Sequence, residues 1–68
     1  MNTIDLGHAL RARRRELGIS QRDLSDLAGV ALHTVSDVES GKGNPTLSTV
    51  VALLAPLGLK LDVRIREL

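Results

Sequence analysis

The sequence contains no cysteine, tryptophan, tyrosine or phenylalanine. Without cysteine it has no disulfide framework and no thiolate metal site. Without aromatic residues its core must be built from Leu, Val, Ile and Ala, and it lacks the stacking platforms typical of single-strand and RNA-loop binding. A 68-residue chain holds one domain with a small core, and oligomerisation is the stabilising device that remains.

The sequence also lacks a long apolar run and a strong net charge. The absence of a membrane-spanning or signal-like segment favours the cytoplasm, with no membrane partner. The formal net charge is only +1, but arginines crowd the first third of the chain, either as a nucleic-acid-facing patch or as an ordinary solvated face. With two histidines, and serines at cap or surface positions, we expect no metal, no cofactor and no enzymatic activity.

Two short helices joined by a tight turn are predicted in the middle of the chain, over residues 21–28 and 32–40. Ser20 is expected to cap the first of them, with Asp23 capping back, and Gly29 is expected to end it. Two short helices that meet at a glycine turn form a helix-turn-helix, which lays its second helix in the DNA major groove.

Helices are also expected on both sides of this unit. The first should cover residues 4–17, and the last should begin at Thr46 and end near Ala55, because Pro56 removes a backbone donor. We expect the inward face of the last helix to comprise Leu47, Val50, Val51 and Leu54. The sequence therefore predicts a helix-turn-helix DNA-binding domain over residues 1–58.

Apolar and charged residues alternate strictly near the C-terminal end of the chain. This two-residue period predicts a half-buried strand within residues 59–68. Its apolar face comprises Leu59, Leu61, Val63 and Ile65. A lone strand leaves its backbone donors and acceptors without partners, and the simplest partner is the same strand from a second copy, paired antiparallel across a two-fold axis. The alternative is a frayed tail. The predicted fold is therefore mainly α, with one C-terminal strand that dimerises the chain.

The stretch from Leu10 to Leu54 resembles the helix-turn-helix of the Cro and phage-repressor (XRE-type) superfamily. The marks that carry the resemblance are Arg14 four residues before Gly18, Ser20-Gln21, Leu24, Ala28-Gly29-Val30, Val35, Glu39-x-Gly41 and Asn44-Pro45-Thr46-Leu47. With its short length and C-terminal strand, the whole chain resembles HipB-type antitoxins, the DNA-binding halves of bacterial toxin–antitoxin pairs. The resemblance implies four to five helices in a lambda-repressor-like domain, a homodimer, a palindromic operator in double-stranded DNA, and a HipA-like toxin partner with a kinase fold.

The resemblance also implies roles for single residues. Arg14 and Glu39 match positions that form a structural ion pair in the superfamily, and we expect that role rather than a DNA contact. Gln21 matches a position whose amide contacts a DNA phosphate near a helix N-terminus, and the alternative is a simple helix-start residue. The other expected phosphate contacts are Arg22, Lys42, Asn44 and Arg15, although Arg15 is equally well explained as an exposed helix charge.

The base-reading surface is expected on the outer face of the second helix of the unit, and comprises Ala31, Leu32, His33, Thr34, Ser36 and Asp37. By matched position, Leu32 reaches a thymine methyl, Asp37 accepts from cytosine N4, and His33 donates or accepts. The alternative for His33 is a solvated surface residue. Members of the superfamily often carry Arg, Lys or Gln at these sites, and this helix carries none, so reading is expected to depend more on DNA shape.

The sequence thus predicts a DNA-binding repressor, the antitoxin of a HipBA-like pair that autoregulates its operon and neutralises a toxin. Two alternatives stay open. One is a phage-type or restriction-control regulator without a toxin partner. The other is a protein-neutralising interaction module with weak DNA binding.

Overall fold

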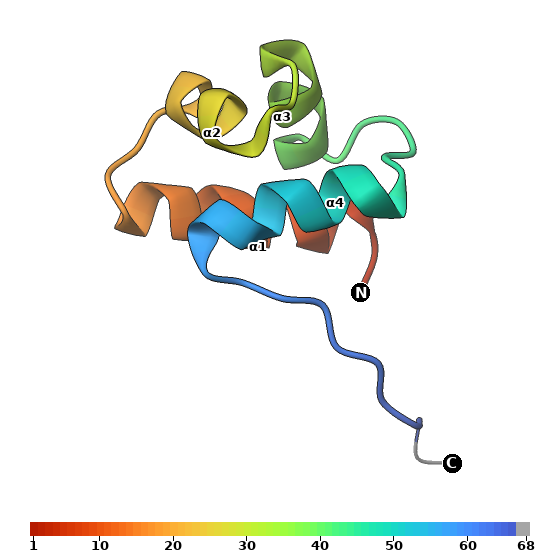
Figure 1. Cartoon of the computed structure of the whole chain (residues 1–68). Helices are drawn as coiled ribbons and strands as arrows, with labels where there is room; N and C mark the ends of the chain where they lie inside the picture. The colour runs from red at the N-terminus through yellow and green to blue at the C-terminus, as the bar shows by residue number, and fades with distance from the viewer. Residues whose placement is uncertain (67–68) are drawn as a thin grey trace.

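The computed structural model describes residues 1–66, and all of the regular structure in this part of the chain is helical (Figure 1). Its four α-helices are α1 (Thr3–Glu16), α2 (Gln21–Ala28), α3 (Leu32–Glu39) and α4 (Leu47–Leu54), and a single 3₁₀ turn, η1 (Ala55–Leu57), follows them. None of the helices described is long and apolar enough to cross a membrane. The predicted mainly α helix-turn-helix fold is confirmed.

The limits of α2 follow from its local sequence. The Asp23 amide donates to Ser20 Oγ at 2.9 Å, and the Ser20 amide donates to the Asp23 carboxylate at 2.9 Å, which completes the predicted capping box. The hydrogen bond from the Ser20 amide is the main cause that holds the pKa of the Asp23 carboxyl below its usual range. Gly29 ends α2 with a left-handed φ of 68°, a conformation that favours glycine, and the chain then turns directly into α3.

The core is wholly aliphatic and draws on every helix. The helix pair α2–α3 lies over α1 and α4 in Figure 1, and α1 packs against α3 while α2 packs against both α3 and α4. The buried hydrophobic side chains are Leu10, Leu24, Val35, Val38, Val50, Leu53, Leu54 and Leu57. These contacts bury the inner face of the helix-turn-helix and leave its outer face free.

The inward face of α4 differs in part from the predicted one. Val50 and Leu54 are buried as predicted, and the third buried residue is Leu53 rather than either of the other two candidates. Leu47 is 70% exposed and Val51 is 49% exposed. The prediction was wrong because residues 50–54 of α4 are all apolar and offer no polar face from which to tell the inner side of the helix, and the packing of α2 against α4 makes the choice.

Pro56 ends α4 close to the predicted point. The α-helix stops at Leu54 and the chain tightens into η1, with Pro56 in the turn. The turn is held by α1, because Arg13 Nε donates to the Leu57 carbonyl at 2.9 Å. This contact fixes the point from which the C-terminal tail leaves the domain.

The predicted C-terminal strand does not form within the chain. Residues 59–66 have no regular structure and run away from the domain on the side opposite α2 and α3 (Figure 1). Leu59 packs against the core, but Val63 and Ile65 are 96% and 97% exposed. A strand requires a neighbouring strand to complete its ladder, and the described residues provide none. The last two residues of the predicted strand, 67 and 68, lie outside the described residues.

A close backbone contact joins α1 to the end of α3. Gly7 is buried at this crossing, and a β-carbon at its position would lie 2.5 Å from the Val38 carbonyl oxygen and 2.6 Å from the Glu39 carbonyl oxygen. Only glycine therefore fits without moving one of the helices. Sequence reasoning did not identify Gly7, because a single glycine inside a helix gives no sign of the helix that crosses it.

We expect Gly7→Ala to destabilise the domain. Overpacking costs about 1–3 kcal/mol, and here the obstacle is backbone that cannot rotate aside, so the cost should exceed the roughly 1 kcal/mol that alanine gains over glycine in a helix. Urea unfolding followed by circular dichroism measures the difference. The exposed neighbour on the same helix gives the control, because His8→Ala should change stability by less than about 0.5 kcal/mol. A Gly7→Ala protein as stable as the wild type would contradict the close contact.

Candidate nucleic-acid interface

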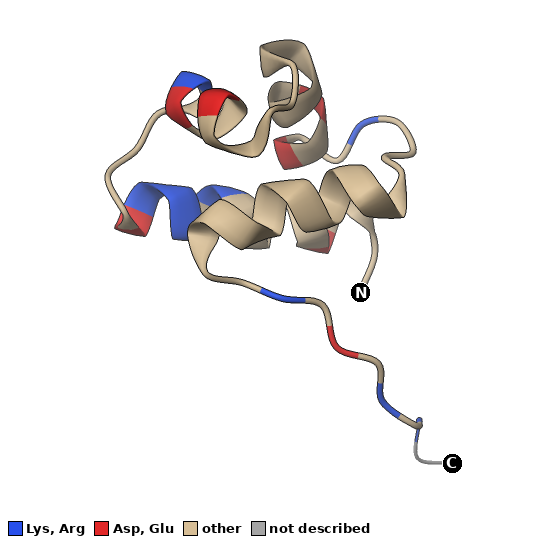
Figure 2. Ribbon diagram, viewed as in Figure 1, with Lys and Arg blue, Asp and Glu red and all other residues tan. Residues whose placement is uncertain are grey.

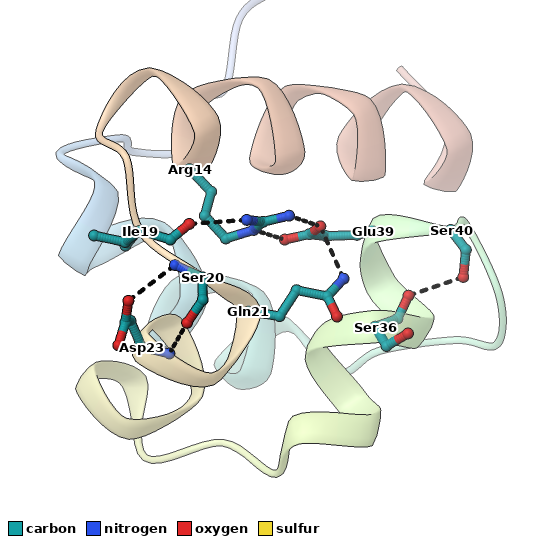
Figure 3. Close-up of polar contacts among 8 residues, drawn as sticks. All are labelled: Arg14, Ile19, Ser20, Gln21, Asp23, Ser36, Glu39 and Ser40. Carbon is teal, nitrogen blue, oxygen red and sulfur yellow. Dashed lines mark hydrogen bonds and ion pairs between the residues drawn. The ribbon is translucent and has the colours of Figure 1, made fainter.

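A buried ion pair joins α1 to α3 beneath the helix-turn-helix (Figure 3). Arg14 Nε donates to Glu39 Oε2 at 2.7 Å and Arg14 Nη2 donates to Glu39 Oε1 at 2.9 Å. The third guanidinium nitrogen, Nη1, donates to the Ile19 carbonyl at 2.9 Å. Arg14 and Glu39 are only 9% and 5% exposed. This two-pronged geometry is the strong form of an arginine–carboxylate contact, and it places both residues inside the domain rather than on its surface.

Gln21 extends this ion pair into α2. Its Nε2 donates to Glu39 Oε1 at 3.1 Å (Figure 3). The Glu39 carboxylate, on α3, therefore accepts hydrogen bonds from side chains of both α1 and α2. Gln21 stands at the first position of α2, as predicted, but part of its amide is already engaged by protein. Sequence reasoning missed this contact, because residues 21 and 39 share no helical or strand period that would bring them together.

The pair is held in its charged form. Burial raises the pKa of the Glu39 carboxyl, but the hydrogen bonds from Arg14 and Gln21, together with the positive charges of Arg14 and Arg11, outweigh burial and leave this pKa below its usual range. The hydrogen bond to Glu39 raises the pKa of Arg14 in turn. Among the described residues, every buried side-chain nitrogen and oxygen has a hydrogen-bond partner. The interior polar network is therefore complete, as a stable buried network requires.

The outer face of α3 carries the residues predicted to read bases. Those that are exposed are Ala31, Leu32, His33, Ser36 and Asp37, while Thr34 is half-buried. The opposite face of the helix is packed in the core through Val35 and Val38. The short helix is thus held by one side and presents the other to solvent.

A shallow cleft of about 170 Å³ lies between α3 and the loop that follows it. His33 and Asp37 line the cleft from the helix, and Lys42 and Asn44 line it from the loop. The structure therefore brings together two predicted base-reading residues and two predicted phosphate contacts. A backbone hydrogen bond from the Lys42 amide to the Asp37 carbonyl, at 2.9 Å, holds the loop against the helix end.

α3 carries no Lys or Arg, and the exposed cations lie on other elements. Arg22 is exposed in the first turn of α2, Lys42 is exposed in the loop after α3, and Arg15 is exposed near the end of α1. Figure 2 shows the basic residues gathered on the second half of α1 and scattered elsewhere, with acidic residues on α2 and α3. Such a surface can hold phosphates at its edges and offer small polar groups at its centre.

An aliphatic four-helix domain with a short, outward-facing α3 defines a helix-turn-helix protein of the Cro and phage-repressor type. The family described as Helix-turn-helix (HTH_3) matches residues 10–63, and the chain belongs to this family. The predicted superfamily is confirmed.

Two relatives and one solved structure show the breadth of the similarity. An uncharacterized HTH-type transcriptional regulator of Haemophilus influenzae is 46% identical over 50 residues, which is 74% of this chain and 51% of that protein. The chain thus spans about half the length of this relative. The regulator y4mF of Sinorhizobium fredii, also uncharacterized, is 34% identical over 87% of this chain and 78% of its own length. The restriction-modification controller protein C.AhdI of Aeromonas hydrophila superposes with a TM-score of 0.80, at 31% identity over 85% of this chain and 88% of that chain.

We expect Glu39→Gln to lower the free energy of unfolding by about 3–5 kcal/mol, because it leaves the Arg14 guanidinium buried without its counter-charge. Urea denaturation measures the loss. The matched control is Glu16→Gln, which removes the partner of an exposed pair with Arg13 (3.2 Å). That control should cost less than about 1 kcal/mol. Similar losses in the two proteins would mean that the buried pair does not hold the domain together.

The stabilisation by the Arg14–Glu39 pair should also be lost at acidic pH. Folding lowers the pKa of Glu39, so its stabilisation is present above its unfolded pKa of about 4.3 and is lost as the pH falls through the lower folded value. Stability should therefore fall on acidification below about pH 4.3 in the wild type and in Glu16→Gln, and fall less steeply in Glu39→Gln. If the free energy of unfolding falls equally steeply with pH in all three proteins, Glu39 does not make this contribution.

Proposed function

We propose that this chain is a homodimeric transcriptional repressor that binds a palindromic operator in double-stranded DNA. The observation that carries the proposal is the outer face of α3, which stands free on the surface while the inner face of the same helix is buried. In a two-fold dimer the α3 helices of both subunits enter successive major grooves on one side of the duplex. The half-sites then lie about 34–36 Å apart.

The base contacts assigned to α3 come from short polar or apolar side chains, none of which carries a positive charge. Leu32 meets a thymine methyl, Asp37 accepts from cytosine N4 and His33 donates or accepts, with Ala31, Thr34 and Ser36 completing the surface. Because α3 has no Lys or Arg, two-pronged contacts to guanine are not available. Sequence preference therefore depends strongly on the shape of the duplex.

Phosphate contacts anchor the protein on either side of these base contacts. Lys42 and Asn44 are supported by their position in the same cleft as His33 and Asp37. Arg22 and Arg15 add exposed cations from α2 and α1. The remaining contact, Gln21, has to share its amide between a phosphate and Glu39, so we assign it a second role in aligning α2 with α3.

The two proposed activities are assigned to successive segments of the chain. Residues 1–58 bind DNA, and residues 59–68 dimerise the chain as an intermolecular strand. The support for the second part is the exposure of Val63 and Ile65, whose apolar side chains gain most from being covered by a second copy.

Two more specific forms of this function have separate support. The antitoxin hypothesis adds a HipA-like toxin, and is favoured by an α3 surface that has no cation and exposes Asp37, a surface that suits a protein partner as well as DNA. The restriction-control hypothesis has no toxin, and is favoured by the 31% identity to C.AhdI. Co-expression with the product of the adjacent gene separates the two: relief of that product's toxicity supports the antitoxin, and an adjacent restriction or modification enzyme supports the controller.

Selection from a random duplex library tests DNA recognition. We expect enriched palindromes whose half-sites are about 10–11 base pairs apart. Ser36→Ala and Asp37→Ala should alter the selected half-site while leaving the thermal melt unchanged, because both side chains are exposed. Failure of the wild type to enrich any sequence would contradict DNA recognition. Selection of the wild-type half-site by both variants would contradict base reading by Ser36 and Asp37.

Salt dependence tests the phosphate contacts on the selected operator. If Arg15, Arg22 and Lys42 of both subunits each neutralise one phosphate, six phosphates are neutralised and the slope of log K against log salt is about −5.4. Arg22→Gln should reduce its magnitude by about 1.8. Arg66→Gln is the control, because it removes a charge from the tail rather than from the helix-turn-helix, and it should leave the slope unchanged.

Proline in the tail tests the dimer. Donors in an antiparallel strand point toward the partner at alternate residues, so Val63→Pro/Arg64→Pro removes a ladder donor whichever of the two faces the second copy. We expect monomers by light scattering and weaker operator binding, whereas Val63→Ile should remain dimeric. An unchanged dimer in the double variant would refute dimerisation through the tail.

A further inference from the structure

The tail carries an apolar face that begins in a groove of the domain and continues beyond it. The groove, about 440 Å³ in volume, lies beside the start of α1 and α4 and is lined by Met1, Leu6, Pro45, Leu47, Val50 and Leu61. Leu61 belongs to the tail itself. Val63 and Ile65 lie past the groove and are almost fully exposed. Alternate residues of a strand share a face, so in the strand proposed for the tail they continue the apolar face of Leu61.

The charged residues of the tail lie together on its other face. Arg64 Nε donates to Asp62 Oδ2 at 2.9 Å, although one residue separates them in sequence. This contact agrees with a strand in which residues 62 and 64 point to the same side. The tail therefore has one apolar and one charged edge within residues 60–66.

Only some registers of an antiparallel pair of tails place apolar residues opposite apolar residues and charged residues opposite charged ones. Residues that lie directly opposite one another share a face, so apolar residues meet apolar residues only if the two-fold axis passes through a residue and not between two. An axis at residue 62 or 64 sets Asp62 against Asp62 or Arg64 against Arg64, and like charges directly opposite are destabilising. An axis at residue 61 pairs Lys60 with Asp62, but it sets Ile65 opposite Leu57, which is buried in the core, and therefore leaves the exposed Ile65 uncovered.

We propose that two copies of this chain pair through their tails with Val63 opposite Val63 of the partner subunit. This inference rests on the proposed homodimer and specifies how it is joined. In this register Asp62 faces Arg64 twice and Leu61 faces Ile65 twice, so both faces are complementary. The unfavourable pair, Lys60 with Arg66, also occurs twice and falls at the two ends of the paired segment. The apolar face of the paired tails covers the groove and the exposed Leu47 of α4.

A cysteine scan of the tail tests the register, and the absence of native cysteine leaves it free of background. Opposed residues of an antiparallel pair have Cα atoms about 4.5–5.5 Å apart, within disulfide range. Val63→Cys should therefore form a disulfide-linked dimer in a glutathione redox buffer. Leu61→Cys and Ile65→Cys should not, because each lies about 14 Å from its own copy, but the double variant Leu61→Cys/Ile65→Cys should cross-link.

Charge exchange gives an independent measurement in solution. Asp62→Arg and Arg64→Asp each replace two attractive cross-strand pairs with two repulsive ones, and each should raise the dimer dissociation constant about tenfold or more. The double variant Asp62→Arg/Arg64→Asp restores the attraction and should return to within about twofold of the wild type. Sedimentation at several protein concentrations measures all four constants, and thermal melts check that the domain remains folded.

The outcomes separate this inference from the homodimer on which it rests. A wild-type chain that remains monomeric at high concentration overturns the homodimer and the register together. A dimer that cross-links at residue 61, 62 or 64 instead of 63, that cross-links equally at every position, or that never cross-links overturns the register alone. A double charge variant as weak as the two single variants likewise counts against it.

Discussion

The Glu39 carboxylate is the contact on which the orientation of α3 depends. It accepts hydrogen bonds from Arg14 on α1 and from Gln21 on α2, while Glu39 itself ends α3. The aliphatic core around it is cohesive but non-directional, because apolar burial rewards area rather than angle. A two-pronged ion pair has a required geometry. The hydrogen bonds from α1 and α2 to the C-terminal end of α3 therefore set the orientation of its outer face.

This arrangement changes the meaning of the arginine-rich segment of α1. Arg14 is buried against Glu39, and Arg13 donates to the carbonyl of Leu57 and to Glu16. Two of the consecutive arginines thus stabilise the fold, and Arg15 beside them is exposed. A cluster that suggests nucleic-acid binding in sequence is, in large part, the means by which α1 holds α3 and η1. Fewer arginines are therefore free to contact phosphates than the sequence suggests, and α3 itself has no Lys or Arg.

The domain has two unlike free surfaces. The outer face of α3 is small and polar, with His33 and Asp37 beside the loop that carries Lys42. On the side where the tail leaves, Leu47 and the apolar edge of residues 61–65 are exposed. We propose the first surface for a duplex and the second for another copy of the chain. Because they lie on different sides of the domain, one can be covered while the other remains free (Figure 1).

The sequence by itself determined the helices, the two ends of α2 and the family, because capping boxes, glycine ends and helical spacing are local, as Ser20, Asp23 and Gly29 illustrate. It also indicated which residues line the outer face of α3. Only the tertiary structure decided that Gly7 admits the backbone of α3, that Gln21 joins the buried pair, and that α4 buries Leu53 in place of Leu47. Each of these depends on an element distant in sequence, and local periodicity contains no information about which helix will cross another.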